Sequence, residues 1–230
     1  MKRILVICLL VLIIACSKEK ELGNMVIQGK IKGLKKGTLY LQKMQDTLLI
    51  SVDSIQLFGN ESFTLTDNIS SAEIYYIYLK GNQNKISFFG EEGTISINDR
   101  LDKFGISPQI KGSKNQKIIE KYKGVATKFQ GKQLDLLAAN IQAQKDNDIE
   151  TSKSLRKQSE RQNIKKYIYT INFALNHADT EAAAYITLTE LVDANIKYLD
   201  SINNSLSINV KQSIYGRELA SFIKTIKETE

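Results

Sequence analysis

The change in hydrophobic period near residue 112 constrains the fold of this chain most strongly. Between residues 25 and 97, apolar and polar residues alternate with a period close to two, in short runs rich in β-branched and aromatic side chains. Turn-forming residues separate these runs, and ten of the 13 glycines lie at or before Gly112. About seven short strands at this spacing predict an antiparallel β-sandwich over residues 25–112.

After Gly112 the hydrophobic period becomes helical, with apolar side chains three and four residues apart. The polar run KDNDIETSKS interrupts this pattern. This pattern predicts three or four amphipathic helices over residues 113–230, and the whole chain is therefore expected to be α+β. The expected helical stripes are 118–141, 164–175, 185–199 and 215–226, with Asp179 or Thr180 as a cap and a turn at 203–205.

The first 15 residues have the layout of an export signal. Lys2 and Arg3 precede an apolar run from Ile4 to Ala15, which is too short for the roughly 20 residues that a membrane-spanning helix needs. Residues 1–15 are therefore expected to be a signal peptide. The end of the run, Ile-Ile-Ala-Cys, resembles the lipobox of bacterial lipoproteins, in which the cysteine becomes the first mature residue and carries acyl chains.

We therefore expect Cys16 to be lipidated and residues 16–24 to form a charged tether. The alternative is an ordinary exported cysteine. Cys8 would leave with the signal, however, so the mature chain would hold no second thiol for an internal disulfide. Several acyl chains give stable attachment where a single chain does not. The expected location is the cell envelope, at the outer membrane, in either leaflet.

The charge of the chain favours a membrane partner over nucleic acid. Removal of Lys2 and Arg3 lowers the formal charge from +7 to +5, and no run of five like charges occurs. A mild basic excess favours anionic lipid surfaces, but it lacks the clustered footprint of a nucleic-acid-binding protein. We expect a lipid-anchored protein that binds no nucleic acid.

The order of the strand and turn segments resembles a known family. The segments MVIQGKIKGLKKGTLYLQ, DSIQLFGNESFTL, YYIYL, FFGEEGTISI and IKGSKNQ follow one another as in the domain of unknown function DUF4369. This resemblance spans roughly residues 25 to 120. It implies the N-terminal domain of thioredoxin-like thiol-disulfide oxidoreductase lipoproteins from Gram-negative envelopes, and the helical region resembles the linker helices that follow it there.

The resemblance does not carry redox activity to this sequence. In the longer relatives, a thioredoxin-like domain with a C-x-x-C pair follows the helices, whereas this sequence ends at Glu230 without one. Thiol exchange needs an attacking thiolate and a resolving thiol, and an acylated Cys16 is neither. We therefore expect no catalytic residue, no metal and no cofactor.

Two further groups of residues invite a catalytic interpretation. His177 lies near Asp179, and Glu91 is followed by a second glutamate. A helix start and a turn explain these residues more simply than a general base or a carboxylate pair. No nucleophile elbow, phosphate loop or calcium loop occurs in the sequence.

The aromatic strands offer a binding alternative. Their side chains could form a stacking platform for a sugar or a groove for a partner. The favoured interpretation is that alternate members fill the core and their neighbours meet the helices. Exposed rings of both Tyr75 and Phe89 would reverse this preference. The residues concerned are Tyr75, Tyr76, Tyr78, Phe88 and Phe89.

Three Asp-(Ser/Thr)-aliphatic triplets resemble the acceptor for O-glycosylation of exported bacterial proteins. Their candidate acceptors are Thr47, Ser54 and Ser201.

The sequence as a whole predicts a non-catalytic envelope lipoprotein that docks a separate envelope protein, such as a thiol-disulfide oxidoreductase. The alternative is a lipoprotein that binds a small solute or glycan through the aromatic strands.

Overall fold

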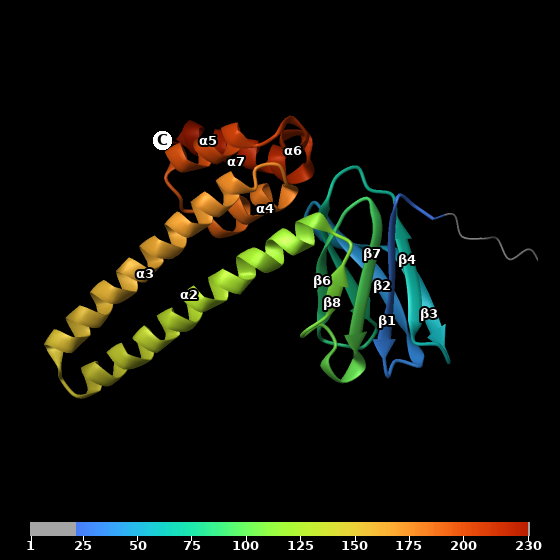
Figure 1. Cartoon of the computed structure of the whole chain (residues 1–230), viewed down its shortest axis with the longest axis horizontal. Helices are drawn as coiled ribbons and strands as arrows, with labels where there is room; N and C mark the ends of the chain where they lie inside the picture. Colours follow the sequence, from blue (N-terminus) through green and yellow to red (C-terminus); the bar gives the residue numbers. More distant parts are fainter. Residues whose placement is uncertain (1–21, 230) are drawn as a thin grey trace, which may run out of the picture.

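The computed structural model describes residues 22–229, so the expected signal peptide and Cys16 lie outside the described residues. A β-sandwich is followed by helices, which confirms the predicted α+β fold (Figure 1). The strands are β1 (Met25–Lys32), β2 (Lys36–Gln45), β3 (Leu48–Phe58), β4 (Ser62–Asp67), β5 (Glu73–Leu79), β6 (Lys85–Gly90), β7 (Gly93–Arg100) and β8 (Gln109–Lys111).

The strands form two four-stranded sheets, in the orders β4-β1-β7-β8 and β3-β2-β5-β6. Each pairing is antiparallel except that of β1 with β7, which run parallel with Lys32 beside Arg100. The sequence pattern did not predict β8, because three residues are too few to show an alternation. It did not predict the parallel pair either, because alternation identifies a strand and not its neighbour.

Strand β5 shows how alternation fills the core. Tyr75, Ile77 and Leu79 are buried between the sheets, whereas Tyr76 and Tyr78 point to the other face and are half-buried. The same alternation in the other strands builds one apolar core between the two sheets. Its fully buried members include Met25, Ile27, Ile31, Leu39, Leu41, Leu65, Ile77, Ile86, Ile95 and Ile97.

Four of the turns lie at the same end of the sandwich. Odd-numbered strands run towards this end and even-numbered strands run away from it, as the strand registers show. Residues 33–35, 59–61, 80–84 and the segment 101–108, which contains a short 3₁₀ helix at Leu101–Lys103, therefore lie together. We call this the helix-distal end, because the helices lie at the opposite end (Figure 1).

The described residues contain six α-helices, more than the three or four expected. They are α2 (Lys114–Lys145), α3 (Ile149–Asn176), α4 (Glu181–Glu190), α5 (Ile196–Ser205), α6 (Ile208–Gln212) and α7 (Ile214–Thr229). The expected helix over 185–199 is in fact the end of α4 and the start of α5. The chain breaks because Asn195 caps α5, accepting a hydrogen bond from the N–H of Lys197 at 3.0 Å. The expected turn at 203–205 is the last turn of α5.

Helices α2 and α3 form a long antiparallel hairpin that projects away from the sandwich. Helices α4 to α7 pack beside the end of the hairpin that is nearest the sandwich (Figure 1). The polar interruption between the two helices is shorter than predicted, because α3 begins at Ile149 with Asp148 as its N-cap. At its other end the hairpin is joined to the sandwich. There Ser113 caps α2 by accepting a hydrogen bond from the N–H of Gln116 at 2.9 Å.

The outer half of the hairpin contains the buried side chains of Leu136 and Ala143, partly buried polar groups between its helices, and exposed apolar groups outside. Gln133 donates to Ser159 at 2.6 Å, and Ser152 donates to Asn140 at 2.8 Å, across the contact between α2 and α3. Large apolar side chains face solvent instead, and Leu134 is 66% exposed. The outer part of the apolar stripes that the sequence predicted is exposed, at Leu134, Leu137, Ile141, Ile164 and Ile168.

Candidate functional site

A large cavity lies where the sandwich meets α4 and α7. Its volume is about 690 Å³, within the range of small-molecule sites. Strands β2 and β5 form one side, and the first turn of α7 with Tyr185 of α4 forms the other. The lining residues that the arguments below use are Lys43, Glu73, Tyr76, Tyr185, Tyr215 and Glu218.

A charged network forms the floor of this junction cleft. The Nζ atom of Lys43 lies 3.0 Å from Asp67 and 3.2 Å from Glu73, and it donates to the hydroxyl of Tyr75 at 3.2 Å. The Tyr75 hydroxyl in turn donates to Asp67 at 2.7 Å. These four side chains come from three strands, so the network ties the floor of the cleft together.

Burial and neighbouring charges set the protonation of this network. Burial raises the pKa of Glu73, and Lys43 offsets that effect only in part. Burial alone would lower the pKa of Lys43. Its hydrogen bonds and ion pairs with Asp67 and Glu73 have a larger, opposite effect, so the pKa of Lys43 is raised overall. Burial raises the pKa of Tyr75 far above its ordinary value. At neutral pH Lys43 is therefore a cation and Tyr75 a neutral donor, which suits a fixed support better than a proton-transfer pair.

Tyrosine rings form the aromatic wall of the cleft. The rings of Tyr185 and Tyr215 lie 5.1 Å apart between centroids, and both contact the buried ring of Phe89 at 5.8 Å. Burial raises the pKa of both tyrosines, so their hydroxyls stay neutral. Tyr76 of β5 lines the same cavity. Aromatic faces beside polar groups are the surfaces that sugars and small organic solutes bind.

The five aromatic residues singled out from the sequence do not share one exposed face. Tyr75, Phe88 and Phe89 are buried, with Phe89 against the helices, so the favoured interpretation of core and helix contacts describes them. Tyr78 lies outside the cleft lining and stacks on Tyr40 at 6.1 Å. Tyr76 alone of the five lines the junction cleft.

The sequence did not identify the helical half of the cleft. Tyr185 and Tyr215 belong to apolar helical stripes, and nothing in their spacing shows that they meet each other and β5. Glu218 follows Tyr215 by one helical turn, and burial raises its pKa. The only sequence signal was the number of tyrosines on helical faces, since a tyrosine in such a stripe brings a polar tip that needs a partner or solvent.

The other candidate residues have structural contacts. The ring of His177 stacks on Phe173 at 4.1 Å, and its Nδ1 lies 2.8 Å from the Phe173 carbonyl oxygen. Glu91 accepts hydrogen bonds from the N–H groups of Lys114 and Asn115 at the start of α2. His177 thus ends α3 and does not start a helix as the sequence suggested, whereas Glu91 lies in its expected turn and from there binds the start of α2.

The three candidate glycosylation acceptors are exposed. Thr47 lies in the turn between β2 and β3, Ser54 is on β3 and Ser201 is on α5. Their modification stays a prediction, as does acylation of Cys16, which lies outside the described residues. Within residues 22–229, no group of three or more His, Cys, Asp or Glu side chains could hold a metal ion. None of the helices described is long and apolar enough to cross a membrane.

Comparison with known proteins identifies one part of the chain. Residues 25–119 match the model of the Domain of unknown function (DUF4369), from the first strand of the sandwich into the start of α2. No curated protein and no solved structure matches the chain. Residues 25–119 therefore form a domain of the DUF4369 family, which confirms the family predicted from the order of strand and turn segments.

Proposed function

We propose that this chain is a lipid-anchored, non-catalytic binding module of the bacterial cell envelope that docks a separate envelope protein through the α2–α3 hairpin. The observation that carries this proposal is the exposed apolar row of the hairpin. Its helices are linked by hydrogen bonds between partly buried polar side chains, and a row of leucine and isoleucine side chains is exposed on the outside. A monomeric protein seldom leaves such a row in water unless another surface covers it.

The spacing of the exposed row fits a helical partner. Leu134, Leu137 and Ile141 follow one another by three and four residues, which is the spacing that meets a second helix along a seam. Residues 128–168 carry nine lysines and arginines against five acidic residues. The partner surface should therefore be an apolar helical stripe with an acidic rim.

The attachment of the module rests on its N-terminal sequence. The apolar run before Cys16 and the lipobox-like Ile-Ile-Ala-Cys support export and acylation. The DUF4369 resemblance supports an envelope partner, such as a thiol-disulfide oxidoreductase, because longer relatives join the two in one chain. The proposed location is the outer membrane.

Site-specific crosslinking in intact cells tests the docking role. A photoreactive residue at Leu137 should capture a discrete partner, whereas the same residue at Lys132, on another face of α2, should not. Replacement of Leu134 and Ile141 by lysine should abolish capture and leave the circular dichroism spectrum unchanged. Capture that is equal at positions 137 and 132, or that survives the lysine substitutions, would rule out the proposed docking surface. Loss of capture in Cys16→Ala would show that docking needs the anchor.

A second candidate function is binding of a small solute or glycan in the junction cleft. The convergence of Tyr76, Tyr185 and Tyr215 around a cavity of about 690 Å³ favours it. Calorimetric titration with envelope glycans should give saturable binding that Tyr76→Ala removes. Tyr78→Ala is the matched control, because Tyr78 is on the same face of β5 but does not line the cleft. Equal loss in both variants would place the ligand elsewhere.

A further inference from the structure

The helix-distal end of the sandwich is strongly basic. Its four turns and the strand ends beside them, residues 30–36, 58–62, 79–85 and 98–109, contain eight basic side chains and three acidic ones. The excess of five compares with +7 for the whole chain of 230 residues, so most of the net charge gathers at one end. The basic residues are Lys30, Lys32, Lys35, Lys36, Lys80, Lys85, Arg100 and Lys103.

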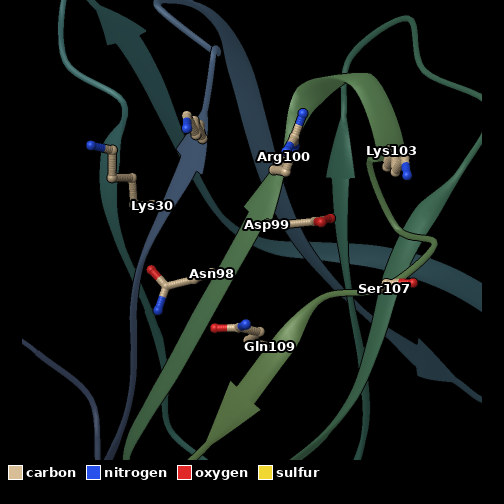
Figure 2. A pocket seen from close by; sticks show the side chains of 8 residues that line it. Lys30, Asn98, Asp99, Arg100, Lys103, Ser107 and Gln109 are labelled. Carbon is tan, nitrogen blue, oxygen red and sulfur yellow. The ribbon is translucent and has the colours of Figure 1, made fainter.

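The parallel pairing of β1 with β7 brings part of this charge around one hollow. Lys30 lies beside Asn98 and Lys32 beside Arg100 in the register of the two strands. Together with Lys103 they line a cavity of about 430 Å³ (Figure 2). Asp99, the acidic residue in this lining, accepts a hydrogen bond from the N–H of Gly105 at 2.7 Å.

Few of these cations are neutralised by their own chain. Among the described residues, Lys30 pairs with Glu61 at 3.2 Å and Arg100 pairs with Asp102 at 2.9 Å. The other six basic side chains of this end form no ion pair in the described part. An exposed ion pair contributes little to stability, so even the two paired cations can bind an external anion instead.

Large apolar side chains stand among the lysines. Phe58, at the end of β3, is 65% exposed, and Ile106, in the segment after the 3₁₀ helix, is 66% exposed. The ammonium group of Lys36 lies 5.9 Å from the centre of the Phe58 ring. Cationic and apolar side chains together on projecting turns are what a protein needs to lie on a membrane, where lysines meet phosphate groups and apolar tips enter the headgroup layer.

We propose that the helix-distal end of the sandwich docks on the anionic surface of a lipid bilayer. Lys32, Arg100 and Lys103 face the lipid phosphates, and Phe58 and Ile106 enter the headgroup region. This contact would orient the sandwich on the membrane and direct the helices away from it. The proposal does not depend on the lipid anchor or on the partner proposed for the hairpin.

Vesicle sedimentation tests the proposal with a chain that begins at residue 22 and so contains every strand and helix described. Phosphatidylcholine vesicles and vesicles that also contain phosphatidylglycerol are compared at two salt concentrations. We expect binding only to the anionic vesicles, and weaker binding in higher salt. The double variant Lys32→Gln/Lys103→Gln should bind roughly 10- to 30-fold more weakly. The double variant Phe58→Ser/Ile106→Ser should also lose binding, although it keeps the charge.

Matched controls separate this surface from general charge. Lys128→Gln/Lys157→Gln removes the same charge from exposed positions on the hairpin, and it should keep binding within about twofold of the unchanged chain. Circular dichroism and thermal melting show whether each variant is folded. An equal loss in the hairpin variant would overturn the assignment of the surface. Equal binding to both kinds of vesicle, or binding to neither, would overturn the proposal itself.

Discussion

The hydroxyl of Tyr215 in the last helix accepts a hydrogen bond from the backbone N–H of Ile74 at 2.9 Å. The two residues are 141 positions apart in the sequence. A second contact lies beside it, because the hydroxyl of Ser71 accepts a hydrogen bond from the N–H of Ile214 at 3.2 Å. The start of α7 is therefore fixed to the segment that leads into β5, and the junction cleft depends on this attachment.

Removal of the Tyr215 hydroxyl should weaken the attachment without removing the ring. Tyr215→Phe should lower the free energy of unfolding by about 1–2 kcal/mol, because the Ile74 N–H loses its partner in a partly buried place. Chemical denaturation measures the change. Tyr198→Phe is the control, since Tyr198 is exposed and its hydroxyl has no hydrogen-bond partner among the described residues. Equal effects would mean that the hydrogen bond contributes nothing specific.

Two glycines should respond to alanine in opposite directions. A Cβ atom at Gly29 would overlap the carbonyl oxygen of Ile97 across the parallel β1–β7 pair, so Gly29→Ala should destabilise the fold by about 3 kcal/mol. At Gly124, inside α2, a Cβ atom meets nothing within 4 Å. Gly124→Ala should stabilise the chain by about 0.5–1 kcal/mol. Thermal melting of both variants tests the pair, and a stable Gly29→Ala protein would contradict the observed strand pairing.

Asn115 connects the sandwich, α2 and α4 through one buried amide. Its side-chain oxygen accepts from the N–H of Ala182 at 2.8 Å, and its nitrogen donates to Glu91 and Glu181 at 2.9 Å each. Asn115→Asp replaces the donor by a third carboxylate and should cost about 3 kcal/mol at neutral pH.

The loss in Asn115→Asp should shrink in acid, where the new carboxyl is protonated and can donate again. Asn163→Asp, at an exposed position on α3, should change little at any pH. Denaturation curves at several pH values measure both. A cost that does not vary with pH would show that repulsion between the carboxylates is not its cause.

Burial of Glu73 should make stability depend on pH. Because its pKa is raised in the folded chain, the folded state holds this proton more tightly than the unfolded state. The resulting stabilisation is full below the ordinary pKa of 4.5 and is lost as the pH rises through the raised value. Glu73→Gln cannot ionise, so its stability relative to the unchanged protein should increase as the pH rises above the ordinary pKa of 4.5. Exposed Glu160→Gln is the control, and a relative stability that falls with pH would contradict the sign.

Glycosylation at Thr47, Ser54 or Ser201 should appear in the intact mass of protein purified from its native envelope. Each occupied site should add one glycan mass to the acylated chain. Alanine at that site should remove the increment and leave the acyl mass in place. A native mass that shows acyl chains and no sugar would end the glycosylation prediction.

Sequence periodicity predicted the elements better than their neighbours. The alternation predicted that every second residue of β5 fills the core, and Tyr75, Ile77 and Leu79 do so, because the side-chain period alone decides this. The parallel contact of Gly29 with Ile97 could not be predicted, since it joins strands far apart in sequence. In the hairpin the helical period was correct, but it could not show whether the stripe at Leu134 was covered. The sequence did not predict the cleft either, because Tyr185 and Tyr215 meet β5 only through tertiary packing, which helical periodicity does not show.

The turn between β6 and β7 touches the chain where it enters the sandwich and where it leaves. The N–H of Gly93 donates to the carbonyl of Asn24 at 2.8 Å, while Glu91 holds the first N–H groups of α2. The chain therefore enters and leaves the sandwich at the same end, beside this turn. A different C-terminal segment spliced after Ser113 would have to offer N–H groups to Glu91, an acceptor for the Phe89 N–H in place of Gln116, and side chains that cover the Phe89 ring.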